Sequence, residues 1–219
     1  MKARWLPLVT LVAVLVGLMA VPAWAVLLKA ADWQMNETSG QMIDASPNNN
    51  IGTLTDVIQT GSVYVFNGST SHVVVADNDT LDPADKDITL TARLMVNGAS
   101  VDDDSYDIVR KGLSTTPGGD YKMEIKQSGF LHCYFRGSGA IVHKVARVNL
   151  LDGNWHTLEC IKTSDSVVAR VDGGRSYKAT GTAGSITSSS NIMVGGKKTN
   201  PFDDMFDGSM DFVSIEIAQ

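Results

Sequence analysis

The chain has 219 residues, and its 18 Lys and Arg stand against 24 Asp and Glu, which gives a formal net charge of −6. Nucleic acids and anionic membrane surfaces are poor candidate partners for such an acidic chain, because both require a basic face. The length suits one domain built from two packed layers of secondary structure.

The N-terminal segment has the layout of a secretory signal peptide. Two basic residues precede an apolar run over residues 8–21, and an Ala-Trp-Ala sequence ends at residue 25. This order of parts is typical of a segment that is cleaved on export. An uncleaved anchor is the alternative, since the uncharged stretch is just long enough to span a bilayer. We predict a signal peptide over residues 1–25, a single domain over residues 26–219, and a secreted, extracellular protein without membrane insertion after cleavage.

Short segments rich in β-branched and aromatic residues follow the leader. In chain order they include VLLKAADWQM, SVYVF, HVVVA, ITLTARLMV, DIVRKG, YKMEIKQ, FLHCYF, AIVHKVARV, HTLECIKT, SVVARVDG, NIMVGG and DFVSIEIAQ. Turn-forming Gly, Asn, Asp, Ser and Pro separate them, and no segment shows a sustained apolar stripe of period 3.6. The pattern predicts an all-β fold, an antiparallel two-sheet β-sandwich of the jelly-roll type.

One of these segments shows a clear alternation of faces. In ITLTARLMV, alternate residues from Ile88 to Leu94 are apolar, so we expect them to face the core, with Arg93 on the opposite face.

The chain has two cysteines, Cys133 and Cys160. Each alternates with apolar neighbours, so both are expected to point toward the apolar side of their strands. In an exported protein an isolated pair without zinc-ligand spacing favours a disulfide. Two buried free thiols, which pack as small hydrophobic groups, are the alternative.

Several segments together resemble a known family. VYVFNGSTSHVVVADNDTLDPADKDITLTARLMV, LLDGNWHTLECIKTSDSVVARVDGG, IMVGG and FDGSMDFVSIEI occur in the order found in laminin G-like and concanavalin A-like jelly rolls. The resemblance covers essentially all of residues 26–219 and implies a binding or adhesion module rather than a fixed chemistry. The sequence departs from the family pattern at Asn67, usually Asp, at His72, usually Tyr, and at Arg93, usually Trp.

Calcium is the cofactor that the resemblance implies. Laminin G domains often place a calcium-binding Asp where this chain has Asp120, although the partner position falls near Thr187, a poor ligand. A second ion could lie between Asn67 and Asp211. Oxygen ligands and an extracellular setting suit calcium. The acidic stretch over residues 77–82 lacks the spacing of a calcium-binding loop, and we interpret it as a solvated turn.

Catalytic signatures are weak. Glycoside hydrolases need two carboxylates across the scissile bond, and the nearest pair within one strand, Asp120 and Glu124, would lie about 13 Å apart at roughly 3.3 Å per residue. A Gly-x-Ser-x-Gly elbow is absent, and we interpret the four histidines as surface or packing residues. We therefore predict a protein that is not an enzyme. A hydrolase or lyase would instead need a buried carboxylate pair, or a Tyr, His and Arg cluster, on one sheet face.

Carbohydrate binding usually relies on exposed aromatic rings with polar groups beside them. Both tryptophans of the mature chain, Trp33 and Trp155, occupy positions that resemble core. The remaining candidates point away from the core; they are Arg93, His132, Tyr134, Arg136 and Glu159.

We expect a glycan to bind either at the loops or on a sheet face that carries Arg93 and Tyr134. The alternative is an adhesion or structural module that recognises a surface protein.

Overall fold

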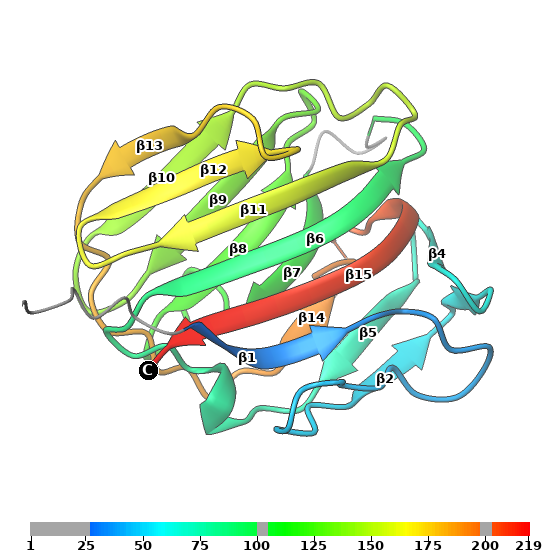
Figure 1. Cartoon of the computed structure of the whole chain (residues 1–219), viewed down its shortest axis with the longest axis horizontal. Coiled ribbons are helices and arrows are strands. Elements are labelled where there is room, and N and C mark those ends of the chain that lie inside the picture. Colours follow the sequence, from blue (N-terminus) through cyan, green and yellow to red (C-terminus); the bar gives the residue numbers. More distant parts are fainter. Residues whose placement is uncertain (1–26, 100–104, 198–202) are drawn as a thin grey trace, which may run out of the picture.

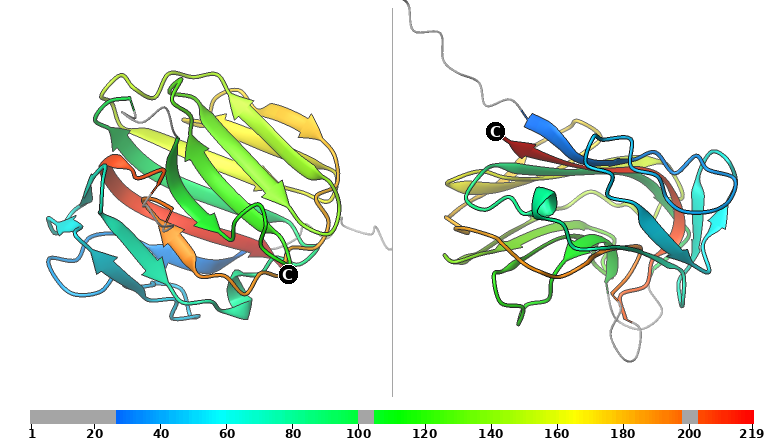
Figure 2. Two further views of the ribbon diagram at one scale, coloured as in Figure 1. Left: turned by 180° about the vertical axis from the view of Figure 1, so that it is seen from behind. Right: turned by 90° about the horizontal axis from the view of Figure 1, so that it is seen from below.

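The computed structural model describes residues 27–99, 105–197 and 203–219. The predicted signal peptide and the acidic run at 102–104 lie outside these residues. Two antiparallel sheets are stacked face to face (Figures 1 and 2), so the predicted β-sandwich is confirmed. Within the described part of the chain, no helix is long and apolar enough to cross a membrane.

Sheet A has eight strands. Its order is β13 (Tyr177–Thr180), β12 (Ser166–Val171), β11 (His156–Lys162), β6 (Ile88–Val96), β15 (Asp207–Ala218), β4 (Tyr64–Asn67) and β3 (Ile58–Gln59), and β1 (Leu27–Trp33) also pairs with β15.

Sheet B has seven strands. Its order is β10 (Ile141–Ala146), β9 (Leu131–Arg136), β8 (Asp120–Ile125), β7 (Tyr106–Lys111), β14 (Ile192–Val194), β5 (His72–Val75) and β2 (Gly52–Thr55).

The core lies between the two sheets and follows from alternation along the strands. On β6 the apolar residues from Ile88 to Val96 are buried at every second position, as the sequence predicts. Sheet B contributes Tyr121, Met123 and Ile125 of β8, which are also buried. Because a strand directs successive side chains to opposite faces, the residues between these positions form the outer faces of the sandwich.

The predicted disulfide is confirmed. Cys133 on β9 of sheet B is bonded to Cys160 on β11 of sheet A, and both residues are fully buried. The bond therefore ties the two layers together through the middle of the core.

The acidic stretch over residues 77–82 is only in part a solvated turn, because Asp79 is exposed whereas Asp77 and Asp82 have a structural role. Asp77 and Asp82 both form ion pairs with Lys111, whose side chain is fully buried, with Asp82 at 3.1 Å. Between them Asn78 caps the short 3-10 helix η1 (Asp79–Leu81) through its side chain. The stretch thus neutralises a lysine that β7 directs inward, since an unpaired buried ammonium would be costly.

Candidate functional site

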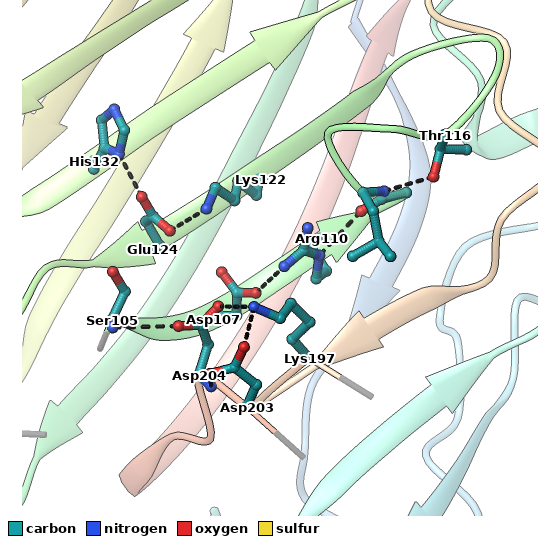
Figure 3. Close-up of polar contacts among 12 residues, drawn as sticks. Ser105, Asp107, Arg110, Thr116, Lys122, Glu124, His132, Lys197, Asp203 and Asp204 are labelled. Carbon is teal, nitrogen blue, oxygen red and sulfur yellow. Dashed lines mark hydrogen bonds and ion pairs between the residues drawn. The ribbon is translucent and has the colours of Figure 1, made fainter. Parts of the chain in front are cut away.

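A cleft of about 410 Å³ lies on the outer face of sheet B, over β7, β8 and β9. A second hollow of about 280 Å³ adjoins it and shares Arg110, Leu113 and Lys197 with it. Charged side chains dominate the first hollow, as Figure 3 shows in part.

A bulge in β7 places two of the charged residues on this face. The register with β8 shifts between Asp107, which lies opposite Glu124, and Val109, which lies opposite Met123. Without the extra residue, Asp107 and Arg110 would point to opposite faces, because they are three positions apart. The bulge turns both outward, so that Arg110 Nη1 forms an ion pair with Asp107 Oδ2.

Glu124 of β8 is the centre of the network. Its carboxylate, 1% exposed, contacts Lys122, Lys126 and His132, with His132 Nδ1 at 2.5 Å. Burial would raise the pKa of Glu124, but the bond with His132 and the charges of the two lysines outweigh it, and the pKa lies well below its usual range. Glu124 therefore stays ionised and fixes three neighbouring side chains, of which Figure 3 shows Lys122 and His132.

A pair of histidines continues this network across two strands. His132 Nε2 lies 3.0 Å from His143 Nδ1, and His143 is exposed on β10. Burial and the neighbouring His132 lower the pKa of His143. His143 is thus a surface residue and His132 a buried one, as interpreted from the sequence, and the two rings together connect the buried Glu124 to the solvent.

Asp107 has the opposite electrostatic setting to Glu124, although the two lie opposite each other in register. Its side chain is completely buried, and Oδ1 has no hydrogen-bond partner within the described residues. Burial raises its pKa to about 6, against the opposing effect of Arg110. Two adjacent carboxyl groups on one sheet face therefore have pKa values that are pushed apart.

Asp120 and Arg136 close one side of the cleft. Arg136 Nε donates to Asp120 Oδ1 at 2.5 Å, and its Nη2 donates to the carbonyls of Leu113 and Thr116, each at 3.0 Å. The loop that carries these carbonyls packs closely, since a Cβ at Gly118 would lie 2.1 Å from the carbonyl oxygen of Thr187. Arg136 is thereby held in one orientation by three groups of the chain.

Lys197 closes the other side. Its ammonium group contacts Asp203 and lies 2.9 Å from Asp204 Oδ2. Asp204 in turn accepts a backbone hydrogen bond from Asp107 through its carbonyl, at 2.9 Å. The segment that precedes β15 is thus joined to the bulged strand β7 (Figure 3).

The charges of this face are arranged in two levels. The carboxylates of Asp107, Glu124 and Asp120 are 0%, 1% and 2% exposed. Lysine side chains above them are more open, at 18% for Lys122 and 39% for Lys126. The buried acids hold the basic groups in place, and the basic groups are what the cleft presents to the solvent.

Comparison with known proteins places this geometry in a family. Residues 67–216 match the family model described as the concanavalin A-like lectin/glucanases superfamily. The chain belongs to this superfamily. A search among curated protein sequences finds no match to the chain.

Solved structures with the fold of this superfamily superimpose on the structure of the chain. Domain 4 of AbnA, an extracellular GH43 arabinanase of Geobacillus stearothermophilus solved with arabinotriose, superimposes with a TM-score of 0.65 at 14% identity, over 88% of this chain and 93% of that one.

Two further structures match over part of their length. The binding domain of Paraclostridial Mosquitocidal Protein 1 superimposes with a TM-score of 0.66 at 13% sequence identity, over 88% of this chain and 49% of that one. This chain therefore spans about half of that domain. Mouse laminin α1 domains LG4-5 superimpose with a TM-score of 0.55 at 18% sequence identity, over 72% of this chain and 42% of that one. These likenesses establish the shared fold.

The structure separates the ligand-binding residues that we predicted. His132, Tyr134 and Arg136 lie on the outer face of sheet B. His132 and Tyr134 line the cleft, and Arg136 is paired with Asp120 beside it. Arg93 and Glu159 lie instead on sheet A, on β6 and β11. The prediction of one sheet face carrying both Arg93 and Tyr134 is therefore wrong, because the two residues belong to different layers.

Trp155 also differs from its prediction. Trp33 is buried in the core, but Trp155 is half-exposed, and the Arg93 guanidinium lies 4.8 Å from its ring centre. The strand β11 begins at the next residue, His156, so Trp155 precedes the regular alternation that the pattern assumed.

The residues predicted for the two calcium sites, Asp120 for one and Asn67 with Asp211 for the other, already have other partners. Asp120 is paired with Arg136, and Asp211 with Arg93 at 2.6 Å. Asn67 accepts backbone hydrogen bonds from its own turn and lies opposite Asp207 in register. Within the described residues no group of three or more His, Cys, Asp or Glu side chains could hold a metal ion. These residues therefore do not fit a calcium site.

Sequence reasoning missed several residues of the cleft. They are Arg110, Lys122, Glu124, Lys126, Lys197 and Asp204, together with Asp107, which is buried beneath Arg110. Charged residues at alternate positions of YKMEIK were the available signal, because a polar set on one strand face marks an outer surface. The role of Asp107 had no such signal, since the bulge reverses its expected relation to Arg110.

Proposed function

We propose that this protein is a carbohydrate-binding domain and that the oligosaccharide lies in the cleft on the outer face of sheet B. The observation that carries the proposal is the aromatic ring of Tyr134 beside charged hydrogen-bonding groups that are already fixed in position. Tyr134 is half-buried at the cleft, and Lys122 Nζ lies 5.8 Å from its ring centre.

This combination suits the chemistry of a sugar. The apolar face of a pyranose or furanose ring packs on an aromatic surface, while neighbouring polar groups select its hydroxyls. Lys122, Arg110 and Lys197 are each held by a carboxylate, so little side-chain freedom is lost when a ligand binds. The adjoining hollow over β14 gives room for a second sugar unit.

The comparisons support a ligand of this class. The arabinanase domain was solved with arabinotriose, and the binding domain of botulinum neurotoxin DC, which shares the fold at a TM-score of 0.62 and 12% identity, was solved in complex with SialylT.

We propose binding without a covalent step. Asp107 and Glu124 are two carboxyl groups opposite each other on one sheet face, and a glycoside hydrolase also uses a pair of carboxyl groups. Asp107 is completely buried beneath Arg110, and Glu124, in the wall of the cleft, is 1% exposed and bound by Lys122, Lys126 and His132, so neither carboxyl group is free to act on a glycosidic bond. Incubation of the protein with each glycan that it binds should therefore leave the glycan intact by mass spectrometry, and cleaved products would contradict this part of the proposal.

We propose further that the protein is exported after removal of residues 1–25. A buried disulfide suits an oxidising compartment. N-terminal sequencing of protein recovered from a secreting host should begin at Val26, and an intact N-terminus on membrane-bound protein would contradict it.

A glycan array probed with residues 26–219 tests the main proposal. We expect defined hits that are lost in Tyr134→Ala and retained in Trp155→Ala, which removes the exposed aromatic of the opposite face. Hits should be equal in calcium and in EDTA, because the predicted calcium ligands already have other partners. An array without hits would overturn the proposal, and so would loss in Trp155→Ala alone, which would move the site to sheet A. Capture of a surface protein with a blank array would favour the adhesion alternative.

A further inference from the structure

We propose that the cleft is selective for an acidic oligosaccharide, one that carries a carboxylate or sulfate group on its sugar units. This inference rests on the proposed function and adds the class of sugar to it. The observation behind it is the two-level arrangement of charge on sheet B, in which buried carboxylates lie beneath basic groups that face the cleft.

The lining of the cleft holds one more basic residue than carboxylates: Arg110, Lys122, Lys126 and Lys197 against Asp120, Glu124 and Asp204. Lys122 and Lys126 share one carboxylate, that of Glu124, which also binds His132. Asp120 is engaged by Arg136. An ammonium group has three donors, so Lys122, which has one carboxylate partner among the described residues, retains donors for a ligand.

The position of this surplus is unusual for the molecule as a whole. The chain has a formal net charge of −6, yet the cleft concentrates Arg110, Lys122, Lys126 and Lys197 around one hollow. Groups that point at the same small volume create a local positive potential, and low-dielectric walls strengthen it. An anionic group in the cleft would meet donors that are charged, fixed and already partly desolvated.

A sugar fits this site better than other polyanions. Tyr134 and Leu113 supply an apolar wall, and Ser114 and Thr115 supply hydroxyls next to the basic groups. Nucleic acid would need a basic surface that continues beyond a single hollow, whereas the chain as a whole is acidic. The geometry therefore favours alternating apolar and anionic features on a short ligand, as in an acidic oligosaccharide.

Matched trisaccharides test the proposal by isothermal titration calorimetry on residues 26–219. The probes are galactotriose, trigalacturonic acid and sulfated galactotriose, so that neutral, carboxylated and sulfated forms are compared at one length. We expect at least one acidic form to bind about tenfold more tightly than the neutral one, a difference typical of one added charge-assisted contact. The acidic affinity should fall with added salt and the neutral affinity should not. The two acidic probes distinguish carboxylate from sulfate recognition.

Single lysine substitutions locate the effect. Lys126→Gln should lower acidic affinity about fivefold to tenfold and leave neutral affinity unchanged. Lys122→Gln also removes a donor to the sugar hydroxyls, so it should lower both affinities, the acidic one more than the neutral one. Lys178→Gln on β13 of sheet A is the matched control, because it removes an equal charge from an exposed lysine of the other layer. Lys126 is the more open of the two test residues, so its variant tests the proposal even where Lys122→Gln fails to fold.

The outcomes separate this inference from the proposed function. A blank glycan array and no binding of any trisaccharide would end both. Neutral sugars that bind as well as acidic ones, or lysine variants that weaken both equally, would overturn the acidic preference and leave sugar binding standing. An oligonucleotide that binds as tightly as the acidic trisaccharides would also overturn it, since the cleft would then be a general anion site.

Discussion

The outer faces of the two sheets differ in how they arrange charge. On sheet A the ion pairs are open and local: Arg93 pairs with Asp211, and Arg170 makes two hydrogen bonds to Glu159, at 2.6 and 2.7 Å. On sheet B each carboxylate is almost fully buried and serves basic groups that lie above it. In an open pair both charges stay hydrated, so the pair contributes little to the stability of the folded protein. Buried carboxylates depend on their partners and therefore fix them.

The difference has an identifiable structural origin. In β15 of sheet A the bulge adds Asp211, which remains at the surface beside Arg93. The bulge of β7 in sheet B instead drives Asp107 below Arg110, under the segment that carries Asp204. The same backbone device thus produces a solvated pair in one layer and a buried one in the other, depending on what covers the strand.

The largest expected effect is the loss of a central carboxylate. Glu124→Gln should lower the free energy of unfolding by about 3–5 kcal/mol, because it leaves basic partners of a buried group uncompensated. Glu159→Gln, the matched change on sheet A, should cost less than about 1 kcal/mol, because its pair is open to water. Urea unfolding of both variants measures the two values.

Equal losses of stability in Glu124→Gln and Glu159→Gln would contradict this prediction. The basic groups of sheet B retain partial solvent access, and if hydration compensates them fully, the two variants would lose the same stability. That result would show that the two faces are energetically alike, and the distinction between them would no longer hold.

Loss of the disulfide, which joins the two sheets, should have the next largest effect on stability. Cys133 lies between His132 and Tyr134 on β9, and Cys160 follows Glu159 on β11. Replacement of both cysteines by alanine should cost about 3–4 kcal/mol for a loop of 27 residues in the chain-entropy model. For a chain of this size that corresponds to a decrease in Tm of roughly 7–15 °C.

The oxidised and reduced protein provide the control for this measurement. Reduced wild type should unfold at the same temperature as the double alanine variant, within the small packing change of the two side chains. An unchanged Tm in both would mean that the packing of the two sheets alone holds the layers together.

The sequence predicted the fold well because alternation is a local property. Residues such as Leu90 and Cys160 point inward in the structure as their neighbours indicated. The site depended on facts that alternation does not contain: which strands share a sheet, and where a bulge interrupts the register. Arg93 and Tyr134 were therefore placed on one face although they lie in different layers, and Asp107 was not recognised as the partner of Arg110.

Asp107 should give sheet B a distinctive pH dependence. Its pKa is raised from 3.8 to about 6 by burial, so between these values the folded state holds a proton that the unfolded state has released. Stability therefore decreases as the pH rises from about 4 to 6. The groups that face Asp107 are Arg110 on its own strand, Lys122 and Glu124 of β8, and Asp204.

The Asp107→Asn variant isolates this contribution. Its free energy of unfolding, measured by urea at pH 4, 5, 6 and 7, should change less over this range than that of wild type. Asp82 and Asp120 also have raised pKa values through burial and contribute in the same direction, so the difference between the two proteins is the quantity to compare. Equal pH profiles would mean that Asp107 is ionised throughout and that Arg110 alone neutralises it.

The smallest expected effect contrasts two histidines, one from each layer. His156 of β11 lies 2.7 Å from Asp172 and 3.0 Å from Asp152, and these carboxylates raise its pKa against the effect of burial. Its contribution to stability is fully present below about pH 6.5 and is lost as the pH rises through the higher pKa of the folded state. His143 of sheet B has a lowered pKa, so its contribution is lost as the pH falls below about 6.5.

The substitution His156→Gln should therefore make stability less sensitive to alkaline pH, and His143→Gln should make it less sensitive to acid, as thermal unfolding between pH 5 and 8 would measure. Responses of the same sign would contradict the assignment, because the pKa of His156 is raised by its carboxylate partners whereas that of His143 is lowered by burial and the neighbouring His132.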